Sequence, residues 1–313
     1  MEGAGGELMR YFDFGCTKKA VSVIGLGCMR MDEISPKQVD RVLKTSLDCG
    51  INFFDHADIY GDGECEKLFG AALKLAQIKR EDVFIQSKCC IRDGLYDFSR
   101  DYILESVDGI LSRLGTDHLD SLLLHRPDAL MDMDEVQEAF SKLYVEGKVQ
   151  SFGVSNMNRF QMELLQCGIS FPVVANQLQM SLAHTPLIDE GINVNTMFDG
   201  AVTRSSGTLE YCRLKGIAVQ TWSPLQKGFF DGVFLGDPEY SQLNQVLDRL
   251  AYKYKAKPDA VAYAWILRYP ARMQVIIGTM NPKHIESASK AADFTLTREE
   301  WYELYRAAGN ELP

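Results

Sequence analysis

The chain has 313 residues, a formal net charge of −10 and an ordinary globular composition, with 46% hydrophobic residues. This acidic balance argues against a broad basic surface that would bind nucleic acid or anionic lipid. No apolar run approaches the roughly 18 residues of a membrane-spanning helix, and no signal-peptide core is present, so we expect a cytoplasmic protein that is not bound to a membrane.

The eight cysteines form no C-x-x-C pair and show no zinc-like spacing, which suits a reducing compartment better than a disulfide scaffold. Adjacent Cys89 and Cys90 are expected to be small buried residues that face opposite sides of their strand. A redox pair is the alternative. Residues 1–8 are expected to form a flexible extension, and residues 9–313 a single domain.

From residue 11 onward, short apolar runs alternate with polar clusters and amphipathic helices. A small hairpin is expected over residues 11–20. Eight strands are predicted at 21–29, 51–55, 83–88, 119–125, 149–156, 172–177, 217–223 and 273–278. Helices are predicted at 36–49, 64–77, 99–114, 134–146, after Asn158, and at 209–215, 242–255 and 260–269. Thr297 and Glu300 form a capping box that opens a last helix.

Eight strands that alternate with helices favour a closed α/β barrel, the (β/α)8 TIM barrel, with an N-terminal hairpin and extra C-terminal helices. An open dinucleotide-binding sheet is the competing fold, because GLGCMR at residues 25–30 looks like its glycine fingerprint. Arg30 stands where the third glycine would be, so that match fails.

Polar side chains follow the carboxyl ends of the predicted strands, where the chemistry of such barrels collects. They are Asp55 with Tyr60, Lys88, His125, Ser155 with Asn156, Gln177, Trp222 with Ser223, and Gly278 with Thr279. Each alone has an ordinary structural explanation, such as a helix cap or a core contact. Three successive strands that each end in an ionisable group predict a functional site.

A phenol is a weak acid, with an ordinary pKa of about 10. A neighbouring ammonium favours its ionised form, an imidazole can donate a hydrogen bond, and a buried carboxylate keeps the ammonium charged. We therefore predict Tyr60 as the proton donor, Lys88 as the group that tunes its pKa, and Asp55 as the anchor of Lys88. His125 would orient the substrate, and His56 and Asp58 would be supporting groups.

Several segments together resemble the aldo-keto reductases, in particular the bacterial branch with LLLHRPD. They are VSVIGLGCM, INFFDHADIYGDGECEKLFG, LDSLLLHRPD, GKVQSFGVSN, VVANQ and IIGTMNPKHI, and the resemblance extends from about Tyr11 to the C-terminus. It implies hydride transfer from a nicotinamide cofactor to a small-molecule aldehyde or ketone. It also implies that Asp55, Tyr60, Lys88 and His125 form the catalytic tetrad and that no metal is required.

The resemblance also implies which residues contact the cofactor. Ser155, Asn156 and Gln177 would hold the carboxamide of the nicotinamide, and Trp222 would stack on its ring. The pyrophosphate would pass a loop that contains Ser223, Pro224, Leu225 and Gly228. The ends of the first and last strands would border the cofactor through Gly27, Cys28, Met29, Gly278, Thr279, Met280, Asn281 and His284.

The chain departs from the family at the adenosine end. Gly278 and His284 stand where many members carry a lysine and an arginine that contact the 2′-phosphate, and Ser287 and Ala288 replace a glutamate and an asparagine. NADPH (NADP) is the expected cofactor because members of the family commonly use it, and NADH (NAD) is the alternative.

Two other functions fit parts of the sequence. One is a nicotinamide-binding redox sensor or regulatory subunit with little turnover. The other is a metal-dependent hydrolase that uses His56, Asp58 and His125, which is weakened by the small number of histidines, five in all. The connection over residues 181–206, with Phe229 and Phe230, would shape a substrate pocket or pack in an interface.

Overall fold

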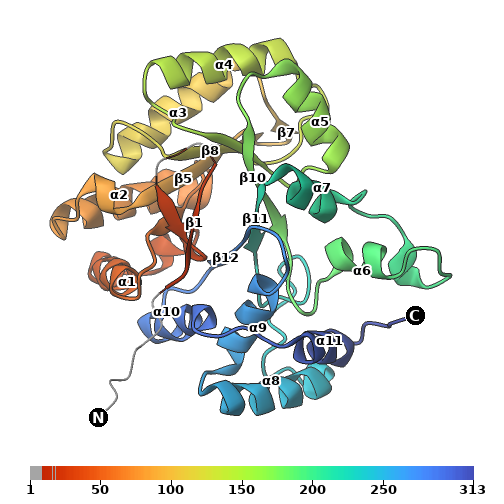
Figure 1. Ribbon diagram of the computed structural model, residues 1–313. Helices are drawn as coiled ribbons and strands as arrows, with labels where there is room; N and C mark the ends of the chain where they lie inside the picture. The colour runs from red at the N-terminus through yellow and green to blue at the C-terminus, as the bar shows by residue number, and fades with distance from the viewer. Residues whose placement is uncertain (1–8, 16, 18) are drawn as a thin grey trace.

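The computed structural model describes residues 9–15, 17 and 19–313, so the extension expected over residues 1–8 lies outside the described part. Eight parallel strands close into a barrel in the order β3, β4, β5, β8, β9, β10, β11 and β12. Helices surround this barrel on its outer side (Figure 1). The predicted (β/α)8 barrel is confirmed.

The barrel strands are short and almost entirely buried, because their inner faces fill the barrel and their outer faces pack against helices. They are β3 (Ile24–Gly27), β4 (Phe53–Asp55), β5 (Phe84–Cys89), β8 (Ser121–Leu124), β9 (Phe152–Ser155), β10 (Val173–Gln179), β11 (Ala218–Trp222) and β12 (Met273–Ile277). The first predicted strand, residues 21–29, is divided in the structure. Residues 20–22 belong to the hairpin, and only residues 24–27 enter the barrel.

The α-helices are α1 (Pro36–Asp48), α2 (Glu64–Leu75), α3 (Arg100–Leu114), α4 (Met133–Val145), α5 (Arg159–Gly168), α6 (Pro186–Ile192), α7 (Thr208–Lys215), α8 (Ser241–Tyr254), α9 (Pro258–Leu267), α10 (Pro282–Ser289) and α11 (Arg298–Ala307). The predicted capping box of α11 is present, with Thr297 and Glu300 bonded to each other's backbone N–H. Helix α6 lies in the predicted connection, where no helix was expected. The phenol of Tyr305 holds it to α11 by donating to Asp189 Oδ1 at 2.7 Å.

Two hairpins lie outside the barrel sheet. The predicted N-terminal hairpin pairs β1 (Tyr11–Asp13) with β2 (Ala20–Ser22), and an unpredicted one pairs β6 (Ile91–Arg92) with β7 (Leu95–Tyr96). Phe14, which follows β1, packs 5.7 Å from Phe53 and 5.0 Å from Phe84 between ring centroids. Figure 1 shows β1 across the end of the barrel. Because Phe53 and Phe84 begin their strands, the N-terminal hairpin closes the end at which the strands start.

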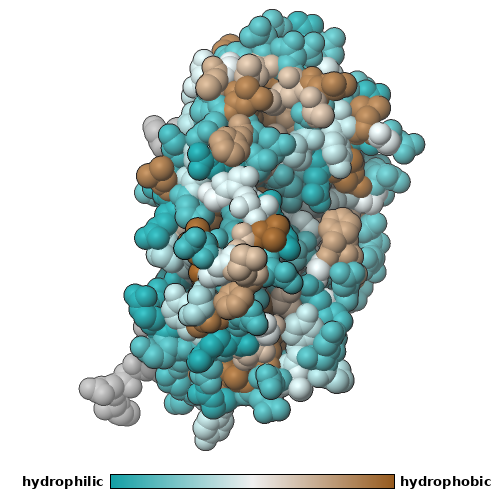
Figure 2. Space-filling view, turned by 90° about the vertical axis from the view of Figure 1, so that its right-hand side faces the viewer, coloured by the Kyte–Doolittle hydropathy of each residue, from teal (hydrophilic) through white to brown (hydrophobic). Residues whose placement is uncertain are grey.

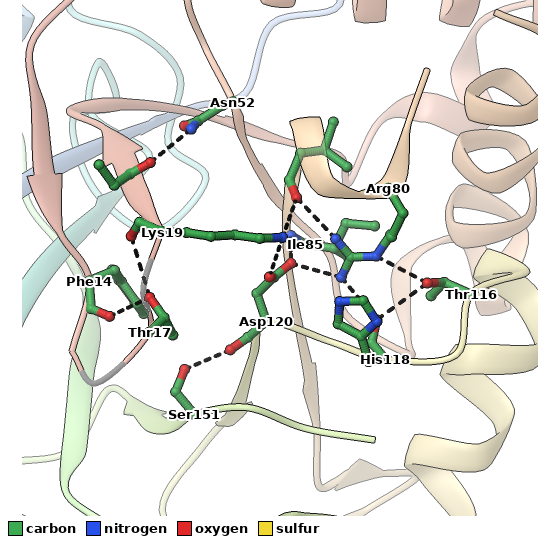
Figure 3. Close-up of polar contacts among 12 residues, drawn as sticks. Phe14, Thr17, Lys19, Asn52, Arg80, Ile85, Thr116, His118, Asp120 and Ser151 are labelled. Atoms are coloured by element: carbon green, nitrogen blue, oxygen red, sulfur yellow. Dashed lines mark hydrogen bonds and ion pairs between the residues drawn. The ribbon is translucent and has the colours of Figure 1, made fainter. Parts of the chain in front are cut away.

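A buried carboxylate fixes this closed end of the barrel (Figure 3). Asp120 is fully buried, and it lies 2.8 Å from the ammonium of Lys19 and 2.7 Å from the guanidinium of Arg80. It also accepts the backbone N–H of Ile85 at 2.8 Å. Asp120 thus links the hairpin, the segment before β5 and the barrel wall through one charged group.

None of the described helices is long and apolar enough to cross a membrane. Figure 2 shows the side of the molecule on which α6 and α7 lie, and apolar side chains occur there as separate patches among hydrophilic ones. Scattered exposed apolar residues of this kind are normal for a folded domain.

We expect Asp120→Asn to lower the free energy of unfolding by about 2–3 kcal/mol, because charge-assisted hydrogen bonds to buried groups contribute about that much. Urea unfolding of both proteins measures this. Asp117→Asn is the matched control, since Asp117 is 91% exposed in its side chain, and its effect should stay within about 0.5 kcal/mol. Equal losses in the two variants would show that Asp120 does not anchor the closed end.

Candidate active site

The predicted polar residues gather at the end of the barrel opposite the hairpin. Asp55 ends β4, Lys88 is the penultimate residue of β5, and His125 directly follows β8. Parallel strands direct their carboxyl ends to one side, so these groups share one mouth.

A buried lysine lies at the centre of this mouth. The Lys88 ammonium lies 2.7 Å from Asp55 Oδ2 and donates to the backbone carbonyl of His56 at 2.8 Å. It lies 3.1 Å from the hydroxyl of Tyr60. Three of the four residues of the predicted tetrad therefore form one continuous hydrogen-bonded group.

A tight turn presents Tyr60 to the lysine. Tyr60 begins a 3-10 helix, η2 (Tyr60–Gly63), in which Gly61, Asp62 and Gly63 all have positive φ, at 55°, 52° and 86°. The backbone conformation favours glycine at position 63, and a Cβ there would lie 2.5 Å from Cδ of Arg113 and would displace that side chain. The GDG sequence after Tyr60 thus sets the direction of the phenol.

His125 completes the group through a ring contact. Its imidazole lies edge-on to the Tyr60 ring, with centroids 6.1 Å apart and an interplanar angle of 82°. The backbone N–H of His125 donates to the carbonyl of Cys89 at 3.0 Å, which ties it to β5. Its Nδ1 has no hydrogen-bond partner among the described residues.

Burial and charge set the protonation of these groups. Burial lowers the pKa of His125 well below its ordinary value, and the charges of Lys88 and Arg126 lower it further. Burial also raises the pKa of Tyr60, and Lys88 opposes the rise without cancelling it. Burial pulls the pKa of Lys88 down, but Asp55 and Tyr60 outweigh burial and the net shift is upward. The resting site therefore holds a neutral phenol, a neutral imidazole and a charged ammonium.

A row of glutamines lies inside the barrel, and of its members only Gln177 was predicted from the sequence. Gln86 and Gln177 both donate to Asp55 Oδ1, at 2.7 and 3.0 Å, and both also donate to Gln220, at 2.9 and 3.2 Å. Gln220 donates to Gln274 at 2.9 Å, and Gln274 donates to the carbonyl of Ser22 at 2.8 Å. In the sequence, the other members of the row occur as single glutamines within the apolar runs VFIQSK, IAVQTWS and MQVIIG. Buried amides need partners of this kind.

Three of the residues predicted to contact the nicotinamide, Ser155, Asn156 and Trp222, are linked by hydrogen bonds through Asn156. The amide of Asn156 donates to Ser155 Oγ at 2.8 Å and accepts from the indole N–H of Trp222 at 3.1 Å. Asn156 has a positive φ of 57°, which turns its side chain back over the end of β9. Gln177 is placed deeper, where its side-chain nitrogen bonds Asp55 and Gln220 and its backbone carbonyl accepts from Ser155 Oγ. The oxygen of its side-chain amide makes no hydrogen bond among the described residues.

The remaining predicted cofactor residues lie on neighbouring strand ends. β12 pairs with β3, which places Gly278 and Thr279 beside Gly27, Cys28 and Met29. The loop after β11, with Ser223, Pro224, Leu225 and Gly228, is held to β10 by a bond from Gln179 to the carbonyl of Gly228 at 2.7 Å.

Helix α10 begins beside this strand end. Asn281 caps it by accepting from the backbone N–H of Lys283 at 3.0 Å. Thr279 Oγ1 accepts the N–H of Asn281 at 3.1 Å and lies 3.4 Å from Nδ1 of His284. Met280 lies between them in the same loop. A side chain added at Gly278 would meet no heavy atom within 4 Å. Open space next to a helix N-terminus suits an anionic group.

Cys89 and Cys90 depart from the sequence prediction. They are both buried, as expected, but their sulfur atoms lie only 3.3 Å apart instead of facing opposite sides. The reason is that β5 ends at Cys89, and Cys90 takes a positive φ of 83°. The side-chain alternation of a strand is lost at that point.

A second group of ionisable residues lies near Lys88. Glu66 accepts from Arg113 at 2.7 Å and from Ser87 at 2.9 Å. Burial raises the pKa of nearby Asp58 to about 7, and the charge of Glu66 adds to this while Arg113 opposes it. Burial, and then Lys88, lower the pKa of His56 to about 3. Among the described residues, no three histidine, cysteine or acidic side chains are grouped so that they could hold a metal ion.

A closed barrel with a buried lysine, tyrosine and carboxylate at its mouth is typical of a barrel enzyme. The model of the Aldo/keto reductase family matches residues 23–308, and the chain belongs to this family. The resemblance inferred from the sequence is confirmed, and the protein is an oxidoreductase of this type.

Relatives and solved structures agree with this assignment. The oxidoreductase YdhF of Escherichia coli is 37% identical over 290 residues, which cover 90% of this chain and 91% of that protein. A 6-dehydroglucose reductase of Agrobacterium fabrum is 35% identical over 292 residues, with coverage of 90% and 91%. The crystal structure of an aldo-keto reductase from Klebsiella pneumoniae in complex with NADPH is similar with a TM-score of 0.76 and 25% identity, covering 96% of this chain and 95% of that chain.

We expect Asp58→Asn to stabilise the protein, and more so at high pH. The pKa of Asp58 is raised from 3.8 to about 7 in the folded state, so the folded protein binds this proton more tightly than the unfolded chain does. Ionisation of Asp58 therefore lowers the free energy of unfolding of the wild type. This loss is absent below about pH 4, grows as the pH rises to about 7, and then stays constant at no more than about 4 kcal/mol.

Urea unfolding at pH 5 and pH 8 measures this difference. The gain in the free energy of unfolding should be larger at pH 8 than at pH 5. Asp62→Asn, in the same turn but at an exposed position, is the control and should show no such pH dependence. A gain that does not change with pH would contradict the raised pKa.

Proposed function

We propose that the protein reduces the carbonyl group of a small-molecule aldehyde or ketone with NADPH, and that Tyr60 donates the proton. The observation that carries this proposal is the position of the Lys88 ammonium, 2.7 Å from Asp55 and 3.1 Å from the Tyr60 hydroxyl, at the barrel mouth. A neutral phenol beside a fixed positive charge is suited to give up a proton during a reaction, because its anion is stabilised as it forms.

Each residue then has a separate task. A bound nicotinamide cofactor supplies the hydride that adds to the carbonyl carbon. Tyr60 gives its proton to the carbonyl oxygen, and Lys88 stabilises the phenolate that remains. Asp55 keeps the ammonium charged and in place. The neutral imidazole of His125 donates a hydrogen bond that orients the carbonyl oxygen.

The residues around the mouth suit this cofactor. Asn156 and Ser155 present an amide and a hydroxyl at the end of β9, which are groups that bond a carboxamide. The open space at Gly278, the N-terminus of α10 and the ammonium of Lys283 suit the phosphate of the adenosine end. The Klebsiella pneumoniae aldo-keto reductase binds NADPH in its crystal structure, which supports NADPH as the preferred cofactor over NADH.

We expect Tyr60→Phe to lower kcat by about 10²–10⁴, the usual contribution of a positioned acid. The dissociation constant for NADPH should stay within about twofold, because the phenol acts on the substrate oxygen. Initial rates with a panel of aldehydes, ketones and quinones measure kcat, and fluorescence titration measures NADPH binding. Near-normal turnover by the variant would exclude Tyr60 as the acid. Tight NADPH binding with only a single slow turnover in the wild type would favour a sensor over an enzyme.

We expect NADPH to quench the fluorescence of Trp222, and to do so at lower concentration than NADH. The other two tryptophans, Trp265 and Trp301, are stacked in the core with ring centroids 4.9 Å apart, so Trp222 is the one that a ligand at the mouth can reach. Trp222→Phe should remove most of the quenching while the circular dichroism spectrum stays unchanged. If the wild type shows no quenching, the cofactor site is not at this mouth.

A further inference from the structure

A second cation lies at the barrel mouth, directly after His125. The guanidinium carbon of Arg126 lies 5.9 Å from the ring centroid of Trp222 and 6.0 Å from that of Phe229. Arg126 is half-buried, and it takes part in no hydrogen bond or salt bridge among the residues that the structure describes. The positive charge of Lys88, by contrast, is balanced by the carboxylate of Asp55, which lies 2.7 Å away.

The acid nearest to Arg126 in its own loop is committed elsewhere. Asp128 accepts the backbone N–H groups of Phe98 at 2.9 Å and Leu130 at 2.7 Å, so it holds the loop in place. Arg126 thus has no carboxylate partner among the described residues, and a guanidinium that is partly withdrawn from water gains from a polar partner. Its donors remain free for a ligand.

An aromatic wall stands beside Arg126. It consists of Trp222, Phe229 and Phe230, with centroid distances of 6.0 Å from Trp222 to Phe229, 6.5 Å from Trp222 to Phe230 and 4.8 Å between the two phenylalanines. Phe229 and Phe230 are 60% and 53% exposed. Adjacent exposed aromatic rings at the mouth of a site are suited to cover the apolar part of a ligand.

We propose that Arg126 determines substrate specificity by binding a carboxylate of the carbonyl substrate, while the aromatic wall covers the apolar part between the two groups. This inference rests on the proposed function and names its substrate class, an aldehyde or ketone that also carries a carboxylate. A guanidinium can donate two parallel hydrogen bonds to a carboxylate, and no hydrogen bond to a described residue occupies these donors in Arg126.

The position of Arg126 in the chain supports this division of tasks. Arg126 follows His125 and lies 5.9 Å from the ring centroid of Trp222, whose indole N–H bonds Asn156 at the same mouth. A substrate whose carbonyl oxygen lies at Tyr60 and His125 can therefore reach Arg126 with its far end. The charge of Arg126 also helps to lower the pKa of His125, after burial and Lys88. The imidazole therefore stays neutral and does not compete with Arg126 for the carboxylate.

The test compares two aldehydes that differ in charge and by one methyl group, 4-carboxybenzaldehyde and its methyl ester, methyl 4-formylbenzoate, with NADPH in excess. We expect the wild type to prefer the carboxylate by about 10- to 100-fold in kcat/KM, the range that a charge-assisted bidentate pair supports. Arg126→Gln should remove this preference by raising KM for the carboxylate, while kcat/KM for the ester stays within about twofold. Arg126→Lys should keep part of the preference, because an ammonium supplies charge without the bidentate geometry.

Two controls make the result specific. Arg92→Gln removes a cation from the neighbouring hairpin, where Arg92 is paired with Asp97 at 2.6 Å, and it should leave the preference unchanged. NADPH binding, measured by quenching of Trp222, should be the same in Arg126→Gln and wild type.

Three outcomes would overturn the inference. Equal kcat/KM for the acid and the ester in the wild type would do so while leaving the reductase itself intact. A loss of NADPH affinity in Arg126→Gln, with both aldehydes affected alike, would assign Arg126 to the cofactor. If neither aldehyde nor any member of the wider panel is reduced although NADPH binds, the proposed function fails and the inference fails with it.

Discussion

The geometry of the mouth depends on one buried ion pair, between Lys88 and Asp55. Removing a charge from water costs several kcal/mol unless partners replace the lost hydration, and here every partner is supplied by the chain. One carboxylate oxygen of Asp55 accepts a hydrogen bond from the Lys88 ammonium, and the other accepts from the side-chain amides of Gln86 and Gln177. Lys88 in turn contacts Asp55, the carbonyl of His56 and the phenol. A loss of any partner would leave a charge without compensation, which explains why the group is so densely bonded.

The two ends of the barrel use charge for different purposes. At the closed end, Asp120 joins Lys19 and Arg80 into a structural contact that links the hairpin to the wall. At the open end, burial keeps phenol and imidazole neutral, and the second cation, Arg126, remains without an acidic partner among the described residues. The structural ion pairs and the predicted catalytic residues thus lie at opposite ends of the barrel, as is usual for this fold.

The sequence was sufficient for the barrel, the order of its strands and the grouping of Asp55, Tyr60 and Lys88, because strand ends in a parallel barrel necessarily share one side. It was insufficient where backbone conformation departs from the regular pattern. The positive φ of Cys90 brings two sulfur atoms together that strand alternation would separate, and Val23 divides a continuous apolar run between hairpin and barrel. The glutamines of the row other than Gln177 were missed because each amide, taken alone, looks like one polar residue in an apolar strand. The roles of the site residues toward cofactor and substrate stay predictions.

The glutamine row connects the hairpin to the carboxylate of Asp55. Gln86 and Gln220 donate to each other, Gln220 also donates to Gln274, and Gln274 donates to the backbone carbonyl of Ser22 in the hairpin. Because these amides share their hydrogen bonds, none of them can turn over without losing bonds to its neighbours. The hairpin therefore anchors one end of the glutamine row. Local unfolding at the closed end of the barrel would loosen the amides that bond Asp55 at the other end of the row.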